Sequence, residues 1–401
     1  MSKTIIIIGA GLAGLSAALQ AAENGCNVKL VSSFPSERAQ SVMAEGGINA
    51  ALNTKDENDS PEEHFTDTIK AACGLADPNA VWGMTQAAPE LVHWLLKLGV
   101  KFNMSGYDDV DLRNFGGQKK KRTAFAQSDT GKQIMTAMID AVRRKEASGM
   151  VERFSHHSFL TLRLCGNICC GCVIRDEYSQ ETVELPGDAV IVATGGMHGL
   201  FGNTTGSLSN TGEVTAELFR LGVPLANGEM IQYHPTTVKC GGKRMLISEA
   251  ARGEGGRLFA MKDGKQWYFM EEKYPELGNL MPRDITAREI WKVSHESEVF
   301  LDMTEISEEV ISNKLSGLAD DCMTYLHKDI RKEPVPVLPG IHYFMGGILV
   351  DEQHRTPIQN LYAAGECCAQ YHGANRLGGN SLLGALYGCL LYTSPSPRDG
   401  A

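Results

Sequence analysis

Five short segments of the sequence concentrate histidine, arginine or carboxylate side chains, and three of the segments also contain glycines. They are QYHPTT (232–237), LISEAARGEGG (246–256), MPRDI (281–285), HYFMGGI (342–348) and HGANRLGGNSLLGALYG (372–388). Taken singly, a histidine or an arginine is more often a surface residue or a satisfied core residue. Together these segments supply a cationic set within an acidic chain: His234, Arg252, Arg283, His342 and Arg376. Because guanidinium groups match carboxylates bidentately, the set predicts a site for carboxylates.

A glycine fingerprint near the N-terminus indicates what lies beside that site. The apolar run Ile5 to Ile8 suits a buried parallel strand, and Gly9, Gly11 and Gly14 follow as G-x-G-x-x-G before a helical segment. The first glycine permits a tight turn, the second admits a pyrophosphate, and the third allows helix and strand to pack closely. The context predicts dinucleotide binding at the helix N-terminus. Beside a redox dinucleotide, the cationic set points to a small dicarboxylate.

One element of the usual NAD fingerprint is absent. An acidic residue is expected about 20 residues after the glycines, at the end of the second strand. Residues Val31 to Ser33 occupy that place and none is acidic. A serine hydroxyl such as that of Ser32 can still bind a ribose, so the prediction of dinucleotide binding stands while that of NAD weakens.

Two later segments return to the same fold. GDAVIVATGGM (187–197) and IQNLYAAGECC (358–368) each read as an apolar strand that ends in a glycine turn. Between them, residues 231–340 mix proline, glycine, aromatic and charged residues. We therefore expect an α/β fold with a Rossmann-like domain, formed by 1–230 and 341–388, and a second α+β domain inserted at 231–340.

Bulk properties exclude several classes of protein. A chain of 401 residues with 43% hydrophobic and 21% charged residues is typical of a globular protein of two domains. The net charge of −10 argues against non-specific nucleic-acid binding. No segment approaches the roughly 20 apolar residues of a membrane helix, and the N-terminus lacks the layout of a signal peptide. We expect a cytoplasmic chain, able to lie peripherally on the cytoplasmic face of a membrane by binding a partner there.

The cysteines predict neither a metal site nor a disulfide framework. There are 11, an odd number, and they are scattered along the chain. Without a secretion signal they are expected to be reduced thiols. Cys169 and Cys172, in CGNICCGC, have C-x-x-C spacing, but no second such pair follows. We expect a β-hairpin that carries small apolar side chains.

The five segments, in this order, resemble the flavoprotein subunits of fumarate reductase and succinate dehydrogenase, within the superfamily that includes L-aspartate oxidase. The similarity runs from residue 4 to about residue 388. It includes EGGINAALN, DSPEEHFTDTIKAA, RNFGGQKKKRTAFAQSDTG and DGKQWYFMEEKYPELGNLMPRDI. Several motifs in register make it far more specific than a glycine fingerprint. The resemblance implies that the Rossmann-like domain binds FAD, that 231–340 is a capping domain, and that a helical C-terminal domain is missing.

The resemblance also assigns cofactor contacts. The fingerprint glycines would lie at the pyrophosphate, and Glu366 would hold ribose or ribityl hydroxyls. Gly46 and Gly47 would bring backbone amides close to the flavin. Ser381 and Leu382 would offer amides at a helix N-terminus to the carbonyl edge of the isoalloxazine ring, which favours the anionic reduced flavin.

At the substrate, the resemblance implies that hydride passes between flavin N5 and a carbon of fumarate. His234, His342 and Arg376 would grip the dicarboxylate, Ser248 would add a hydroxyl, and Phe115 would pack nearby. Arg283 matches the proton donor of the family, with Glu249 and Arg252 as its relay. An arginine is not ordinarily deprotonated in proteins, so this role requires a transient deprotonation helped by a second cation. A plain carboxylate clamp is the alternative role for Arg283.

The sequence departs from the family at the residue that binds flavin covalently. The family pattern is Arg, Ser or Thr, His, Ser or Thr, then Ala-x-Gly-Gly, whereas residues 38–47 read RAQSVMAEGG. Gln40 replaces the histidine and Ala39 the hydroxyl residue, so FAD is expected to bind without a covalent link. Loss of the link is expected to lower the flavin potential and to favour fumarate reduction over succinate oxidation.

Two alternatives remain open. L-aspartate oxidase also binds FAD non-covalently, although RNFGGQKKKRTAF is more similar to the reductase. A flavin-binding structural or regulatory module without activity would require the cationic set to be accidental.

Two further expectations concern partners and the C-terminus. The family works with an iron–sulfur subunit and a membrane anchor, and this chain has no cysteine cluster for iron–sulfur ligation. Residues 389–401, CLLYTSPSPRDGA, depart from the family, and Pro-Ser-Pro cannot continue a helix. We expect a non-native tail there.

Overall fold

A five-stranded parallel sheet carries the dinucleotide fingerprint. The computed structural model describes residues 2–106 and 108–390. The sheet has the order β20-β10-β1-β2-β6, and each neighbouring pair is parallel. Its strands are β1 (Thr4–Ile8), β2 (Asn27–Ser32), β6 (Val151–Ser155), β10 (Ala189–Val192) and β20 (Leu361–Ala363). The apolar run near the N-terminus therefore forms the central strand, as predicted, because strands covered on both faces require apolar side chains throughout.

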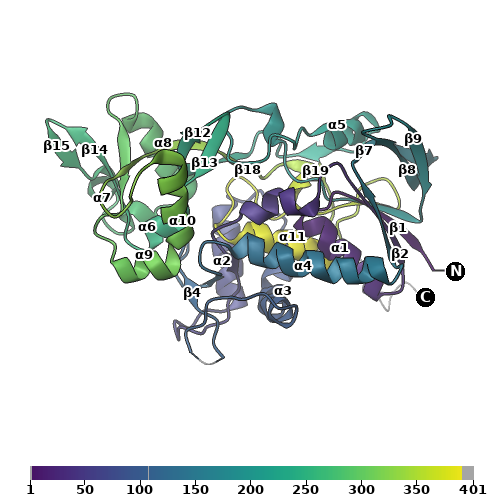
Figure 1. The fold of residues 1–401 in the computed structure, drawn as a ribbon, viewed down its shortest axis with the longest axis horizontal. Helices are drawn as coiled ribbons and strands as arrows, with labels where there is room; N and C mark the ends of the chain where they lie inside the picture. The colour runs from purple at the N-terminus through teal and green to yellow at the C-terminus, as the bar shows by residue number, and fades with distance from the viewer. Residues whose placement is uncertain (1, 107, 391–401) are drawn as a thin grey trace.

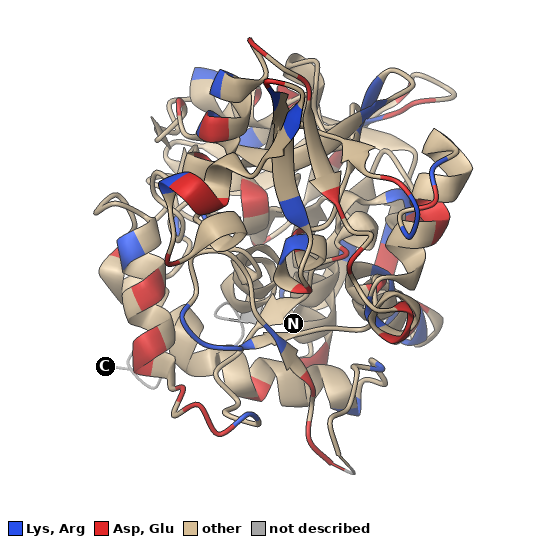
Figure 2. Cartoon of the chain, turned by 90° about the vertical axis from the view of Figure 1, so that its left-hand side faces the viewer, with Lys and Arg blue, Asp and Glu red and all other residues tan. Residues whose placement is uncertain are grey.

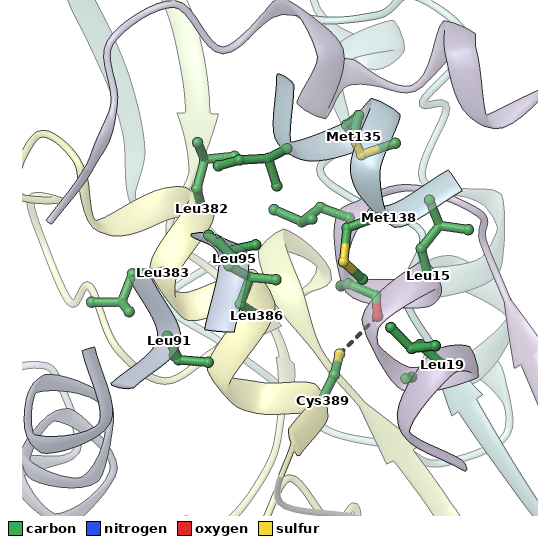
Figure 3. Close-up of a cluster of buried hydrophobic side chains, with 14 of the residues drawn as sticks. Leu15, Leu19, Leu91, Leu95, Met135, Met138, Leu382, Leu383, Leu386 and Cys389 are labelled. Carbon is green, nitrogen blue, oxygen red and sulfur yellow. Dashed lines mark hydrogen bonds between the residues drawn. The ribbon is translucent and has the colours of Figure 1, made fainter. Parts of the chain in front are cut away.

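Four helices that are distant in the sequence pack together beside this sheet. They are α1 (Leu12–Glu23), α3 (Pro78–Lys97), α4 (Thr130–Ala147) and α11 (Asn380–Leu390). Leu15, Leu91, Met138 and Leu386 supply buried side chains from each of the four to one apolar cluster (Figure 3). At the far end of α11, the Cys389 thiol donates to a backbone carbonyl of α1 at 2.9 Å. This packing fixes α11, whose first residues face the site described below.

Residues 231–340 form a second region with its own core. A three-stranded antiparallel sheet, β13-β12-β18, joins it to the first region (Figure 1). Its strands are β12 (Ile231–Cys240), β13 (Lys243–Leu246) and β18 (Leu338–Phe344). A four-stranded sheet is built from β14 (Arg257–Lys262), β15 (Lys265–Trp267), β16 (Val299–Asp302) and β17 (Val335–Pro336). The helices are α6 (Glu249–Gly253), α7 (Phe269–Lys273), α8 (Arg283–Val293), α9 (Glu308–Lys314) and α10 (Ser316–Asp321).

Smaller elements complete the described chain. One antiparallel sheet contains β7 (His157–Cys165), β8 (Ile168–Asp176) and β9 (Thr182–Pro186). A second contains β3 (Ile48–Asn49), β4 (Leu112–Arg113) and β5 (Thr123–Ala124). A third contains β11 (Leu225–Ala226), β19 (Gly347–Leu349) and β21 (Cys368–Ala369). The remaining helices are α2 (Pro61–Ala71) and α5 (Glu213–Arg220).

The β7–β8 hairpin corrects one prediction. Cys165 and Cys170 form a disulfide across its turn, so the expectation that every cysteine is a reduced thiol is wrong for this pair. The hairpin brings their Cα atoms to 6.5 Å, which is within the range of disulfides. Cys169 and Cys172 are free and buried in an apolar core, as expected of small apolar side chains.

Acidic and basic residues are interspersed along the same elements in Figure 2. Over residues 2–106 and 108–390, no helix is long and apolar enough to cross a membrane, and no group of three or more His, Cys, Asp or Glu could hold a metal ion. Helix α11 continues to Leu390, two residues into the predicted tail. The rest of that tail, 391–401, lies outside the described residues.

Candidate active site

One continuous cavity of about 490 Å³ links the glycine fingerprint to the capping region. It is lined by nearly all of the predicted site residues: Gly9, Gly11, Ser32, Gly46, Gly47, Phe115, His234, Ser248, Glu249, Arg283, His342, Glu366, Arg376, Ser381 and Leu382. Gly14 and Arg252 do not line it. The structure therefore brings the two groups of predicted residues, cofactor and substrate, to a single cavity.

The glycine turn has the geometry that the fingerprint requires. Gly9 adopts φ +111°, and a Cβ there would lie 2.3 Å from the carbonyl oxygen of Ala193. A Cβ on Gly14 would lie 1.8 Å from the carbonyl oxygen of Gly9, so Gly14 serves the packing of α1 on β1 and lies behind the cavity wall. At Gly11 the nearest atoms would be 3.8 Å away, which leaves the backbone open to a ligand.

Polar groups at this end fit a dinucleotide. The Ser32 hydroxyl is buried and, within the described residues, has no hydrogen-bond partner, as expected of a group reserved for a ribose. Glu366 accepts a hydrogen bond from the backbone amide of Phe344 at 3.0 Å. Its Oε1 also lies 3.1 Å from Nε2 of His198, a residue that sequence reasoning did not single out. These partners hold the carboxylate of Glu366 at the cavity wall.

The loop that would cover a flavin includes Gln40 and Glu45, which both line the cavity. Gln40 occupies the position at which the family pattern has the linking histidine, and it presents a carboxamide. Glu45 was not predicted as a site residue. Burial and the neighbouring Asp321 and Asp129 raise the pKa of Glu45 to about 8, against the opposing charge of Arg113. The carboxyl group of Glu45 is therefore largely protonated at neutral pH.

A buried polar network positions the N-terminus of α11. Nδ2 of Asn49 donates to the carbonyl of Gly378 at 2.7 Å and to Oδ1 of Asn380 at 2.7 Å. The backbone amide of Asn49 donates to the carbonyl of Gly379 at 3.1 Å. Because Ser381 follows directly, these bonds set where the first amides of the helix face the cavity. Asn49 lies within the EGGINAALN segment, but no local pattern marked it as a positioning residue.

Glu249 lies between two guanidinium groups at the capping end. Arg283 donates to Glu249 Oε2 from Nε at 2.8 Å and from Nη2 at 2.6 Å. Arg252 donates to Glu249 Oε1 at 3.1 Å, and its own Nη1 donates to a backbone carbonyl at 2.6 Å. Burial favours the neutral carboxyl, but the two arginines outweigh it and hold the pKa of Glu249 below its ordinary value. Arg252 does not line the cavity and lies behind Glu249, and its predicted role as a relay member stays a prediction.

The two histidines are not cations, which corrects the prediction of a five-membered cationic set. The rings of His234 and His342 meet edge to face, with centroids 5.0 Å apart. Burial, together with the charge of Arg283, holds the pKa of His234 well below its ordinary value. Burial, His234 and the nearby arginines do the same to the pKa of His342. Positive charge at this end of the cavity therefore resides on the arginines.

Arg376 is buried beside the histidines without a carboxylate partner. Its guanidinium lies over the ring of Tyr343, 4.2 Å from the centroid, and it forms no ion pair with a described residue. Its Nε is buried without a hydrogen-bond partner in the same part of the chain. Burial and the charge of Arg283 lower the pKa of Arg376 to about 9. Such a group gains by accepting an anion.

Gln232 joins Arg283 and Arg376, which both line the cavity. Its Oε1 accepts from Nη1 of Arg283 at 3.0 Å, and its Nε2 donates to the backbone carbonyl of Arg376 at 2.7 Å. The QYHPTT segment contains Gln232, but its partners lie 51 and 144 residues away in the sequence. Sequence reasoning therefore missed its role.

A glycine turn of the dinucleotide-binding type that opens into a cavity lined by buried arginines is typical of a dinucleotide-dependent oxidoreductase. The model of the "FAD binding domain" family matches residues 4–382, and the chain belongs to that family. It is accordingly an FAD-dependent oxidoreductase. The residues at the cradle fit this cofactor. The buried Ser32 hydroxyl has no hydrogen-bond partner among the described residues, and the backbone at Gly11 is open to a ligand.

Several known enzymes and enzyme subunits are similar to this chain over nearly its whole length. The succinate dehydrogenase flavoprotein subunit of Bacillus subtilis is 44% identical over 395 residues, which cover 96% of this chain and 67% of that protein. An L-aspartate oxidase of Nostoc is 35% identical, covering 94% of this chain and 65% of the oxidase. The structure of an E. coli quinol fumarate reductase variant matches with a TM-score of 0.90 at 30% identity, covering 98% of this chain and 69% of that chain. The chain thus spans about two thirds of these relatives.

Proposed function

We propose that the chain is the flavoprotein subunit of an enzyme that interconverts fumarate and succinate, with a bias toward fumarate reduction. The observation that carries the proposal is Arg376, a buried guanidinium without a carboxylate partner among the described residues, on a cavity continuous with the FAD cradle. A buried charge of this kind is costly unless a ligand compensates it. A small dicarboxylate supplies that compensation.

The cradle residues hold the cofactor in this proposal. Gly9 and Gly11 lie at the pyrophosphate, with Ser32 and Glu366 at hydroxyl groups. Gly46 and Gly47 face the ring system, as do the amides of Ser381 and Leu382 at the start of α11, where the helix dipole favours negative charge. When bound, the flavin supplies the transfer of hydride to or from a substrate carbon. Gln40 offers no group for a covalent link, so we infer that FAD is held non-covalently.

The clamp on the dicarboxylate is formed by Arg376, His234 and His342, with Ser248 at the N-terminus of α6. Neutral imidazoles can donate N–H groups to a carboxylate, while Arg376 contributes the positive charge. Phe115 packs against this end and helps to exclude water. In a dry site these donors stabilise negative charge as it develops on the substrate more strongly than they would in water.

Arg283 holds the proton that is delivered to the substrate. Its Nε and Nη2 rest on Glu249, whose other oxygen accepts from Arg252. A proton lost from Arg283 can therefore be restored through Glu249, with Arg252 as the second member of the relay. Arg252 is the second cation on this carboxylate.

L-aspartate oxidase is the second candidate, supported by its similarity and by the glutamine at position 40. L-aspartate carries an ammonium group, which needs an anionic partner. Glu249 at this end of the cavity is already engaged by two guanidinium groups. This arrangement favours fumarate over L-aspartate.

The decisive experiment compares the two substrates on purified, FAD-loaded protein. Fumarate is supplied with reduced viologen, and L-aspartate with oxygen. We expect viologen oxidation with fumarate, a slower reverse reaction with succinate, and no peroxide from L-aspartate. Peroxide formation without viologen oxidation would instead assign the oxidase. Bound FAD without either activity would support the non-enzyme alternative.

The partners are inferred from relatives. The flavoprotein subunit of an 8-methylmenaquinol:fumarate reductase of Wolinella succinogenes is 35% identical over 95% of this chain. We propose an iron–sulfur subunit as the electron donor and a membrane anchor beyond it, with this chain on the cytoplasmic face.

A further inference from the structure

The hydroxyl group of Thr205 lies against the imidazole of His342. Thr205 Oγ1 and His342 Nδ1 are 2.8 Å apart, and both side chains are largely buried from solvent. Thr205 belongs to the segment between β10 and α5, and neither the sequence motifs nor the proposed clamp use it. Its hydroxyl is nevertheless the described hydrogen-bond partner of Nδ1 of His342, a residue that lines the cavity.

The surroundings determine where the hydroxyl proton goes. The carbonyl oxygen of Ile341 already accepts the backbone amide of Thr205 at 2.8 Å, and Oγ1 of Thr204 lies 3.2 Å from it. Thr204 Oγ1 is also 2.8 Å from Nδ1 of His198, so the backbone amide of Thr205 is the fixed donor to the Ile341 oxygen, and distance decides between the acceptors of the Thr205 hydroxyl. Thr205 Oγ1 is 3.4 Å from the same oxygen but only 2.8 Å from His342 Nδ1. Donation by the hydroxyl to the nearer acceptor, Nδ1, leaves the ring proton of a neutral His342 on Nε2.

This placement matters because His342 is neutral. Its pKa is held well below the ordinary value by burial and by the neighbouring His234, Arg283 and Arg376. A neutral imidazole has one N–H donor and one acceptor nitrogen. If Nδ1 carried the proton, the nitrogen left to the cavity would be an acceptor and would repel a carboxylate.

We propose that Thr205 is a positioning residue that holds His342 in its Nε2–H tautomer and thereby makes the ring a carboxylate donor. The ligand chemistry rests on the proposed function, whereas the tautomer rests on the contacts of Thr205 alone. Thr205 contacts neither substrate nor cofactor in this proposal. It acts through His342.

The test uses the FAD-loaded protein with ¹⁵N-labelled histidine. Side-chain nitrogen spectra distinguish a protonated nitrogen from an unprotonated one, and a hydrogen-bonded acceptor from a free one. His342→Gln assigns the signals. Thr205→Val removes the hydroxyl at nearly constant volume, and Thr205→Ser retains it. Thr136→Val, at an exposed threonine whose hydroxyl donates to a backbone carbonyl of its own helix, is the matched control.

In the wild-type protein we expect a protonated Nε2 and a hydrogen-bonded, unprotonated Nδ1 on His342. In Thr205→Val the Nδ1 signal should move to that of a free nitrogen. The dissociation constant for succinate, measured from the flavin absorption spectrum, should rise about tenfold, which corresponds to roughly 1.4 kcal/mol. Thr205→Ser should restore both readings, and Thr136→Val should change neither.

A protonated Nδ1 in the wild-type protein would overturn the proposal, as would unchanged succinate binding in Thr205→Val. If the wild-type protein bound no succinate, the proposed function would fail, but the nitrogen spectra of the substrate-free protein would still decide the tautomer. Equal FAD content in all variants shows that the fold is retained.

Discussion

Two buried arginines in this molecule differ in what faces the guanidinium. Arg122 is fully buried, with Nη2 at 2.8 Å from Asp59 and Nη1 at 2.9 Å from Asp67. Arg376 is 3% exposed and rests on the ring of Tyr343 without an ion-pair partner in the described chain. Burial of a charge is costly in both places, yet only the first is compensated by the fold itself.

The difference separates a structural charge from a functional one. At Arg122 two carboxylates complete the site, so a further anion would gain nothing. At Arg376 we propose that a ligand supplies the compensation, and burial together with the charge of Arg283 lowers the pKa of this guanidinium. The same contrast explains why the neighbours of Arg376 are neutral histidines, since protonated rings would add further uncompensated positive charge to a buried site.

The largest effect is expected from Arg283→Ala. This change removes the proposed proton donor, so fumarate reduction should fall by at least about 10³-fold, with little change in flavin content. Viologen oxidation measures fumarate reduction, and the ratio of flavin to protein absorbance measures the flavin content. Arg331→Ala, which breaks an exposed ion pair with Glu308, is the control and should leave both unchanged. Fumarate reduction at the wild-type rate by Arg283→Ala would exclude the donor role.

Arg122→Met should act on stability instead. It leaves Asp59 and Asp67 buried without their partner, which is expected to lower the free energy of unfolding by about 3–5 kcal/mol. Urea denaturation of the FAD-loaded protein measures this. If Arg122→Met were as stable as the wild type, the distinction drawn between the two arginines would not hold.

Arg376→Met sharpens the comparison because its two expected effects have opposite signs. The kcat/KM for fumarate should fall about 10²-fold, or roughly 2.7 kcal/mol, since the clamp loses its charge. Without dicarboxylate, however, the free energy of unfolding should stay constant or rise, because an uncompensated buried charge is removed. A loss of stability as large as that of Arg122→Met would mean that Arg376 is held by the fold.

Structure that depends on residues close together in the sequence could be predicted, whereas contacts between residues far apart in the sequence could not. The strand, glycine turn and helix at residues 4–23 are local, and the sequence predicted them directly. The resemblance to the family led to the prediction that the dispersed motifs meet at one cavity. It did not reveal that Asn49 holds Asn380, 331 residues away, or that Arg252 lies behind Glu249. Neutral histidines were also missed, because a pKa depends on burial and on neighbours that only the fold supplies.

Glu45 provides a smaller, pH-dependent effect. Its pKa is raised to about 8 by burial and by Asp321 and Asp129, so the folded state keeps a proton that the unfolded state loses near pH 4.5. The free energy of unfolding therefore falls as the pH rises from 4.5 to about 8. Between pH 6 and pH 8 it should fall by about 2 kcal/mol, at ~1.36 kcal/mol per pH unit. Glu45→Gln should abolish this part of the slope in denaturant titrations at the two pH values. An identical slope in wild type and variant would show that Glu45 ionises freely.

The smallest effect is expected from Gln40→His. In the wild-type protein FAD should be released by acid precipitation, which leaves a pellet without flavin fluorescence, because a carboxamide cannot form the histidyl link. Gln40→His alone should still release its FAD, since attachment also depends on the neighbouring residue and Ala39 lacks the hydroxyl of the family pattern. The double variant Ala39→Ser/Gln40→His tests that reason. Flavin retained in the wild-type pellet would show that another side chain forms the link, and would remove the argument for a low-potential flavin that favours fumarate reduction.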